Sequence, residues 1–454
     1  MTLSVQPYKG ARDFYPEEKR LQKYMFAKMR EVCETFGYEE YDAPVLEPTD
    51  LFLAKGNQEI IDEQTYTFLD RGGRSVTIRT EMTPTVSRMV AGRRQELAYP
   101  ARWYSIPNVW RYERMQRGRL REFWQLNVDI FGVEGIEAEH EIIVLADRIM
   151  RSYGAKPEMY TIKVNSRKLI NYLFRDYLGM SDTQQEMLVR LIDRMHKMED
   201  ESFYAQADAI LTPTQRENGV LTKLTELLKA KKLNDLPPGV ESLPSVLALK
   251  QLSDLLAESK VTNVRFDITL MRGFDYYTDI VFEVFDEHPE NNRSMFGGGR
   301  YDGLVAMFGV EPVPTVGFGM GDVTLQNFLE GHELLPVLAP ETDAYVVLLG
   351  ENMYEKAQGV LARFREDGLR IAVDTTDRKL EKQIKTAVKK GIDHIIFIGE
   401  AELADDRYKL KNLETSVEET HGSERIVAML RDRRRKHAVP KVAPAETDAD
   451  DFDV

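Results

Sequence analysis

Five arginines surround a single glycine in the segment Trp110-Arg-Tyr-Glu-Arg-Met-Gln-Arg-Gly-Arg-Leu-Arg-Glu-Phe-Trp-Gln125. The flanking residues, 101–109 and 123–131, have the composition of strands, so we predict a hairpin within a mostly antiparallel sheet. Guanidinium groups suit polyphosphates because their planar donors bind two oxygens at once and keep their charge. The segment therefore indicates a sheet that carries a polyphosphate site, and a hairpin with solvated charges is the alternative.

Three further segments combine glycine with polar or aromatic side chains. They read Leu270-Met-Arg-Gly-Phe-Asp-Tyr-Tyr-Thr278, Phe296-Gly-Gly-Gly-Arg-Tyr-Asp-Gly-Leu304 and Val316-Gly-Phe-Gly-Met-Gly-Asp322. Glycine lets a ligand approach the backbone, and arginine with tyrosine can orient a small polar ligand. Tight turns, bulges and ordinary core tyrosines are the alternative. None of the three matches a phosphate-binding loop or a dinucleotide fingerprint.

The order of elements predicts three structural regions. Strand patterns, including a hairpin at 65–69 and 75–79, dominate the first 165 residues and return after residue 260. A proline-rich linker at 335–340 precedes alternating strands and helices, which are typical of a small α/β domain. The predicted domains are 1–165 and 260–335 for the sheet domain, 166–259 for a helical insertion, 342–437 for a C-terminal domain and 438–454 for a disordered acidic tail.

Within the C-terminal domain, the periodicity predicts four strands and three helices. The predicted strands are 345–349, 370–373, 394–398 and 408–411, and the predicted helices are 353–366, 377–390 and 424–436.

Composition sets broad limits. The 454 residues include 61 lysines and arginines against 75 acidic residues, a formal net charge of −14, and 43% are hydrophobic. These values exclude a disordered chain, a coiled coil and a disulfide scaffold. The acidic excess limits non-specific binding to nucleic acid, but it leaves local recognition open because part of it lies in the tail.

The sequence predicts a cytoplasmic protein with no membrane association. The single cysteine, Cys33, lies on a helical apolar stripe, so we expect a buried thiol in a reducing compartment. No apolar run reaches the roughly 18 residues of a membrane span, and the N-terminal residues lack a targeting pattern.

Metal and nucleophile chemistry find no support in the residue spacing. The seven histidines are scattered and only one cysteine is present, so we predict no protein-held metal. A Gly-x-Ser-x-Gly elbow is also absent from the sequence.

Taken together and in this order, the segments resemble those of the histidyl-tRNA synthetases, a family of class II aminoacyl-tRNA synthetases, over about residues 5–435. Residues 10–16 and 36–44 resemble the motif 1 region, the arginine hairpin resembles motif 2, and Gly317 to Gly321 resembles the glycine strand of motif 3. The run Arg272-Gly-Phe-Asp-Tyr-Tyr277 resembles a signature peculiar to histidyl enzymes. The resemblance implies an α/β protein with an α+β catalytic domain, whose antiparallel sheet is flanked by helices, together with a helical insertion and a separate C-terminal anticodon-binding α/β domain.

The resemblance also implies a reaction and its partners. A homodimer would activate L-histidine with ATP and Mg²⁺ carried by ATP, then transfer the histidyl group from the adenylate to histidine tRNA.

The family's functional residues fall on definite positions of this sequence. By resemblance, Arg111 and Arg272 are catalytic and bind the α-phosphate, Arg121 binds the outer phosphates, and Asp129 and Tyr277 bracket the imidazole. Glu81 and Gln125 are implied to hold the α-ammonium group. The implied ATP-binding set is Arg111, Glu113, Arg121, Arg272, Gly319 and Gly321, and the histidine-binding set is Glu81, Thr83, Gln125, Asp129, Tyr276 and Tyr277. The spacing of Lys379, Lys382 and Lys385 places them on one helix face, which predicts tRNA contact, and an ordinary solvated face is the alternative. Lys411 lies on a strand that resembles the family's strand near the anticodon site.

The chain departs from the family pattern at motif 3. The segment Gly321-Asp-Val-Thr-Leu325 lacks the arginine that the family uses to contact ATP, so we expect a basic group from elsewhere to replace it. Two other functions stay open: a non-catalytic paralogue that regulates histidine biosynthesis as an ATP phosphoribosyltransferase subunit, and a module that senses RNA or histidine. The retained C-terminal domain and histidyl signature favour the enzyme over both.

Overall fold

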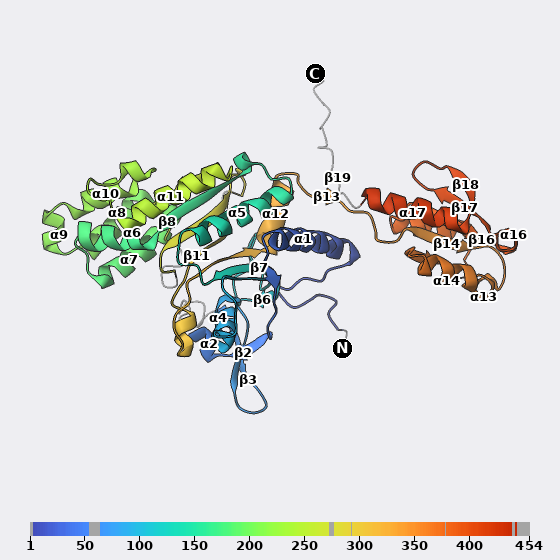
Figure 1. Cartoon of the computed structure of the whole chain (residues 1–454), viewed down its shortest axis with the longest axis horizontal. Helices are drawn as coiled ribbons and strands as arrows, with labels where there is room; N and C mark the ends of the chain where they lie inside the picture. Colours follow the sequence, from blue (N-terminus) through green and yellow to red (C-terminus); the bar gives the residue numbers. More distant parts are fainter. Residues whose placement is uncertain are drawn as a thin grey trace, which may run out of the picture. The chain divides into compact units, whose positions relative to one another are not determined.

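The computed structural model describes residues 3–53, 64–271, 277–291, 293–376, 378–437 and 441–442 (Figure 1). It contains two compact units, one formed by Met1–Asp13 and Tyr24–Leu334 and the other by Phe14–Lys23 and Leu335–Val454. Helix α1 (Pro16–Thr35) contributes residues to both. Within the described ranges, every helix is too short or too polar to cross a membrane.

The larger unit is built on a mostly antiparallel sheet, which has nine strands within the described residues. The strands follow the order β1-β5-β7-β12-β11-β10-β8-β9, and β6 pairs with β7. The pairs β1–β5 and β8–β9 are parallel. The strands are β1 (Glu39–Glu40), β5 (Ala101–Ser105), β6 (Asn108–Trp110), β7 (Glu122–Phe131), β8 (Tyr160–Ser166), β9 (Val264–Phe266), β10 (Ile280–Asp286), β11 (Ser294–Arg300) and β12 (Thr315–Gly321).

The two central strands give the sheet two unlike faces. In β7 the side chains of Gln125, Asn127 and Asp129 alternate with buried apolar residues, and in β12 glycine alternates with buried apolar residues. Because successive side chains point to opposite faces, one face is apolar and the other carries glycine and polar groups. Helices α5 (Glu137–Ser152) and α12 (Asp322–Gly331) contact both strands and cover the apolar face.

A small second sheet follows the first helix. Its strand order is β2-β4-β3, with all pairs antiparallel, and it confirms the hairpin predicted at 65–69 and 75–79. Its elements and neighbours are β2 (Leu46–Pro48), α2 (Asp50–Leu53), β3 (Tyr66–Leu69), β4 (Ser75–Ile78) and α4 (Thr83–Arg93).

The stretch between β8 and β9 is helical, as its composition predicts (Figure 1). Two of its helices begin with reciprocal capping boxes, in which Ser181 pairs with Gln184 and Thr212 with Gln215. Its helices are α6 (Arg167–Tyr172), the π-helical turn η2 (Leu173–Tyr177), α7 (Asp182–Asp193), η3 (Met195–Lys197), α8 (Asp200–Ile210), α9 (Pro213–Glu217), α10 (Val220–Leu228), η4 (Leu233–Asp235) and α11 (Pro244–Glu258). Short 3₁₀ turns η1 (Pro157–Met159) and η5 (Val305–Phe308) lie outside it.

The smaller unit contains a sheet of order β15-β14-β16-β17-β18, in which β14 is parallel to β15 and β16. Val346, Phe364 and Ile396 lie in its core. A separate pair joins β13 to β19. Its elements are β13 (Pro336–Val337), β14 (Ala344–Leu348), α13 (Met353–Lys356), α14 (Gln358–Glu366), β15 (Ile371–Val373), α15 (Leu380–Lys389), β16 (His394–Ile398), α16 (Glu400–Asp405), β17 (Arg407–Asn412), β18 (Glu418–Gly422), α17 (Ser423–His437) and β19 (Lys441–Val442).

This architecture confirms the predicted fold class and differs from some of the predicted elements of the smaller unit. The single helix predicted at 353–366 is divided at Ala357 into α13 and α14. Strand β18 was not predicted, because its sequence, Glu-Glu-Thr-His-Gly, lacks apolar alternation. It is an exposed edge strand that depends on pairing with β17.

Candidate active site

Glycines on two neighbouring strands open the polar face of the sheet. A Cβ atom at Gly319 would lie 2.7 Å from the amide nitrogen of Gln125, and one at Gly317 would collide with the Asp129 carboxylate. Glycine at these two positions therefore makes room for the side chains of Gln125 and Asp129 over the sheet. The opposed residues of β12 and β7 are Gly317–Asp129, Gly319–Asn127 and Gly321–Gln125, and the glycine pairs of β11 and β12 are Gly299–Gly317 and Gly297–Gly319.

Asp129 is a buried acid on this face. Its carboxylate accepts a hydrogen bond from the hydroxyl of Tyr301, directly after β11. Burial raises the pKa of Asp129 to about 7, and the hydrogen bond from Tyr301 opposes the rise. Because burial has removed water from the Asp129 carboxylate, a ligand that donates an N–H hydrogen bond to it would stabilise its charged form.

Tyr277 and Glu81 share the electrostatic environment of Asp129. Burial raises the pKa of Tyr277, and the charges of Glu81, Glu283 and Asp129 raise it further. Its ring lies against β11, since a Cβ atom at Gly299 would be 2.9 Å from Tyr277 Cδ1. Burial also raises the pKa of Glu81, and the positive charge of Arg111 opposes that rise. These predicted residues are therefore within electrostatic reach of one another.

A cavity of about 220 Å³ continues along the same face and is lined by the arginine hairpin. Arg111 lines it, donates from Nε to the Thr80 carbonyl at 3.0 Å, and lies 5.5 Å from the centre of the Phe123 ring. Arg119 lines it too and pairs with Glu113 at 3.3 Å. Further lining residues come from other strands: Gln125, Gly319 and Gly321, with Glu283 of β10 and Ser294 of β11.

The predicted phosphate ligand Arg121 is not among the described residues that line this cavity. Its guanidinium group lies 3.8 Å from the centre of the Tyr112 ring, and it donates to the Tyr8 hydroxyl at 3.3 Å. Its backbone N–H donates to the Gly10 carbonyl at 2.9 Å. The N-terminal segment thus holds Arg121 against an aromatic cluster, and Arg119 takes the position facing the cavity.

The other predicted ligand-binding residues of this region lie at the starts of two helices or outside the described residues. Thr83 is the first residue of α4 and is partly buried. Gly321 precedes α12, whose first residue Asp322 bonds to Arg12 at 2.7 Å and to the Trp124 N–H at 3.0 Å. The predicted residues Arg272 and Tyr276 lie outside the described residues.

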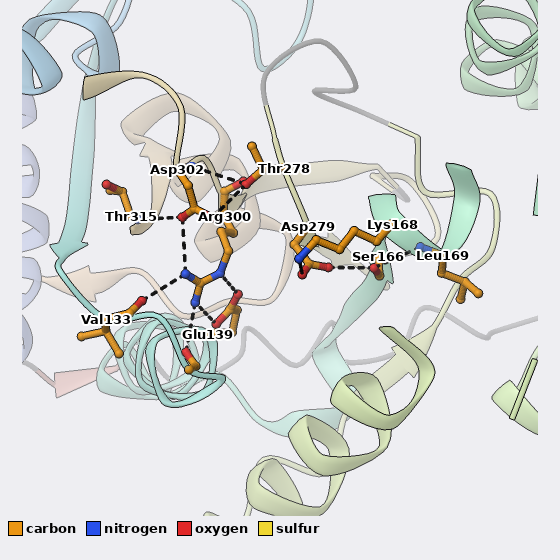
Figure 2. Close-up of polar contacts among 11 residues, drawn as sticks. Val133, Glu139, Ser166, Lys168, Leu169, Thr278, Asp279, Arg300, Asp302 and Thr315 are labelled. Atoms are coloured by element: carbon orange, nitrogen blue, oxygen red, sulfur yellow. Dashed lines mark hydrogen bonds and ion pairs between the residues drawn. The ribbon is translucent and has the colours of Figure 1, made fainter. Parts of the chain in front are cut away.

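A buried arginine at the end of β11 holds the strands of the site together (Figure 2). Arg300 donates to both carboxylate oxygens of Glu139 on α5, at 2.6 and 2.7 Å. The Arg300 carbonyl accepts a hydrogen bond from the Thr278 N–H at 2.7 Å. Because Thr278 follows Tyr277, this network fixes the chain directly beyond the predicted imidazole ligand.

Replacing Glu139 with glutamine should destabilise the larger unit, because the buried Arg300 would lose its closer and more buried carboxylate partner and keep only Asp302, at 3.4 Å. We expect the free energy of unfolding to fall by about 3–5 kcal/mol, measured by denaturant unfolding. The matched control is Lys168→Ala: Lys168 pairs with Asp279 at 2.6 Å, but its side chain is 62% exposed. Lys168→Ala should change the free energy of unfolding by no more than about 1 kcal/mol. Equal losses in the two variants would contradict the role given to the buried pair.

The predicted tRNA-binding lysines lie in the smaller unit. Lys379, at the start of α15, and Lys382 and Lys385 within it are exposed, and Lys385 pairs with Glu381 at 2.6 Å. Lys411 on β17 is partly buried and pairs with Glu418 at 2.9 Å. The α15 lysines thus share an exposed element, whereas Lys411 belongs to a pair across β17 and β18.

The structure adds site residues that sequence reasoning missed. Arg119, Phe123 and Glu283 line the cavity, and Tyr301 bonds to Asp129. Period-two alternation places Phe123 on the face of Gln125, and this signal was available in the sequence. Among the described residues, no group of three or more His, Cys, Asp or Glu side chains is placed to hold a metal ion.

Comparisons with known proteins show which family the sequence matches. The family model "Histidyl-tRNA synthetase" matches residues 10–323, and the model "Anticodon binding domain" matches residues 343–433. The histidine–tRNA ligase of Leptospira biflexa is 40% identical over 415 residues, which cover 90% of this chain and 94% of the relative. The histidine–tRNA ligase of Thermoplasma volcanium is 34% identical over 417 residues, which cover 92% of this chain and 96% of the relative.

Solved structures support the same fold. The crystal structure of histidyl-tRNA synthetase from Nostoc sp. PCC 7120 has a TM-score of 0.79 at 24% identity and covers 95% of this chain and 100% of its own. The crystal structure of apo Staphylococcus aureus histidyl-tRNA synthetase has a TM-score of 0.70 at 24% identity, and the match covers 94% of this chain and 100% of that one. The fold, the family models and the identity to curated relatives agree: the chain belongs to the histidyl-tRNA synthetase family.

Proposed function

We propose that the chain attaches L-histidine to its cognate tRNA in two steps. The histidine carboxylate first attacks the α-phosphate of ATP, forming a P–O bond and releasing pyrophosphate. A hydroxyl of the terminal adenosine of tRNA then attacks the acyl carbon of histidyl-adenylate, and AMP leaves. One observation carries the proposal: on a single sheet face, buried carboxylates adjoin a cavity lined by arginines.

The buried end of this face is suited to histidine. We propose that Asp129 and Tyr277 bind the two imidazole nitrogens, while Glu81 and Gln125 hold the α-ammonium group. Thr83 and Tyr276 complete the proposed set. Amino acids without both ring nitrogens would leave these buried polar groups unpaired, and that penalty gives the site its selectivity.

The arginine-lined cavity is suited to the nucleotide. We propose that Arg111 neutralises the α-phosphate as charge develops there and that Arg272 acts from the opposite side. Glu113, Gly319 and Gly321 bind the rest of ATP. Because Arg119 faces the cavity and Arg121 does not, Arg119 is the better candidate for an outer phosphate.

Mg²⁺ would enter with ATP as part of the substrate. The Glu113 and Glu283 carboxylates and the Ser294 hydroxyl line the cavity, and hard oxygen donors of this kind suit Mg²⁺. When bound, the ion supplies charge neutralisation between phosphate oxygens.

The smaller unit is proposed to bind the anticodon region of histidine tRNA. The exposed lysines of α15, Lys379, Lys382 and Lys385, offer positive charge to phosphates, with Lys411 as a further contact. We also propose a homodimer in the cytoplasm. In the small sheet β2-β4-β3, Leu46 and Phe68 are each 46% exposed, which fits a subunit interface.

The regulatory paralogue is less well supported than the enzyme. Such proteins typically lack the C-terminal domain, whereas residues 343–433 of this chain match the anticodon-binding model.

Transfer of radiolabelled histidine to tRNA tests the whole proposal. We expect acid-insoluble histidyl-tRNA to form only when ATP, Mg²⁺ and histidine tRNA are all present. A chain that binds histidine but charges no tRNA would instead fit a regulatory or sensing protein.

A further inference from the structure

The wall of the proposed nucleotide cavity that α12 forms contains no positively charged side chain. The first turn of α12 supplies Asp322, Val323 and Thr324, and the last two line the cavity with Gly321. The Asp322 carboxylate already accepts hydrogen bonds from the Arg12 guanidinium group and from the Trp124 N–H. Outer phosphates placed against this wall would therefore need a cation from another element.

Arg293 lies near this wall, at the tip of the arginine hairpin. It directly precedes β11, next to Ser294, which lines the cavity. Its Nη1 donates a hydrogen bond to the Arg117 carbonyl at the tip of the arginine hairpin. This hydrogen bond thus joins the start of β11 to the hairpin tip.

Gly118 marks where these elements meet. A Cβ atom at Gly118 would lie 3.0 Å from Arg293 Nη1, 3.5 Å from the amide nitrogen of Asn327 and 3.6 Å from the Thr324 methyl group. Gly118 has φ +78°, which favours glycine in this turn. Gly118, Ser294 and Thr324 line the cavity; Arg293 is not itself a lining residue, and its guanidinium group lies directly beside Gly118 at the hairpin tip.

The hydrogen bond of Arg293 goes to a neutral acceptor, which a phosphate could replace. Arg119 is partly neutralised by Glu113, whereas the partner found for Arg293 is a neutral carbonyl oxygen. A phosphate oxygen is a stronger acceptor for a guanidinium than a carbonyl, because both partners are then charged. Glu283, on the neighbouring strand β10, also lines the cavity and adds negative charge that a phosphate-bound metal ion would offset.

We propose that Arg293 binds the outer phosphates of ATP and supplies there the positive charge that the first turn of α12 lacks. Arg293 would exchange the Arg117 carbonyl for phosphate oxygens while staying beside the hairpin tip. The inference rests on the proposed function, because it assigns a residue to the ATP site of that reaction.

Steady-state kinetics of histidine-dependent ATP–pyrophosphate exchange test this assignment. In Arg293→Ala, we expect the KM for ATP to rise about 10- to 100-fold, the range for losing a hydrogen bond to a charged group. The KM for histidine should stay within about threefold. In Arg293→Lys, the KM for ATP should lie between that of the unaltered protein and that of Arg293→Ala. The matched control is Arg265→Ala, since Arg265 is exposed on β9 and bonds to the nearby carbonyls of Thr262 and Val264.

Inhibition by AMP separates phosphate binding from support of the hairpin. If Arg293 binds outer phosphates, the inhibition constant of AMP should stay within about twofold in Arg293→Ala. An equal rise for AMP and ATP would assign Arg293 to the hairpin alone and overturn the proposal, as would an unchanged KM for ATP. Loss of exchange in the unaltered protein would instead reject the proposed function itself.

Discussion

Replacing Arg111 with alanine should lower kcat/KM for adenylate formation by about 10²- to 10³-fold, the usual loss when one fixed positive group is removed from a developing negative charge. Arg111 lines the proposed nucleotide cavity, and its Nε donates a hydrogen bond to the Thr80 carbonyl at 3.0 Å. It is therefore oriented before ATP arrives. Histidine-dependent ATP–pyrophosphate exchange measures the loss directly.

A second arginine of the same hairpin provides the control. Arg114 is exposed and is not among the cavity-lining residues, so Arg114→Ala should keep exchange within about threefold. Similar losses in both variants would mean that the overall charge of the hairpin matters, and not the position of Arg111.

Replacing Asp129 with asparagine should raise the KM for histidine about a hundredfold, because a charge-assisted hydrogen bond to the imidazole is lost. The KM for ATP should stay within about threefold, since the arginine-lined cavity keeps its residues. An equal rise in both constants would show that Asp129 supports the fold of the site instead of the bound amino acid.

The same substitution should change how stability depends on pH. The pKa of Asp129 is raised to about 7 in the folded protein, against about 4 for an unfolded aspartate. Between these values the unfolded chain has lost the proton while the folded protein retains it, so the wild type loses stability as pH rises from 4 to 7. Above pH 7 the loss is complete, and three pH units correspond to about 4 kcal/mol.

Asp129→Asn has no such proton to lose. Its melting temperature relative to the wild type, measured without ligands, should therefore increase between pH 4 and pH 8. Parallel curves for the two proteins would contradict the raised pKa of Asp129.

Much of the catalytic sheet could be predicted from the sequence because its signals are local. Alternation in β7 and the glycines of β12 place Gln125, Asp129 and Gly319 on one face, and pairing of the two strands brings them together. The family resemblance added which ligand each residue would meet.

The position of Arg121 required a contact that local sequence does not contain. Tyr8 and Gly10, more than a hundred residues earlier, hold its side chain and backbone, while Arg119 faces the cavity. The same holds for Arg293, which reaches the hairpin tip only in the folded chain. Long-range contacts of this kind decide which of several arginines meets the nucleotide.

The central claim is that one sheet face selects histidine and activates it with ATP. Its most direct test is ATP–pyrophosphate exchange by the full chain with each of the twenty amino acids in turn. The account predicts rapid exchange with L-histidine and a rate at background level with the other nineteen. Exchange supported equally by another amino acid, or no exchange with histidine while histidine still binds, would contradict it.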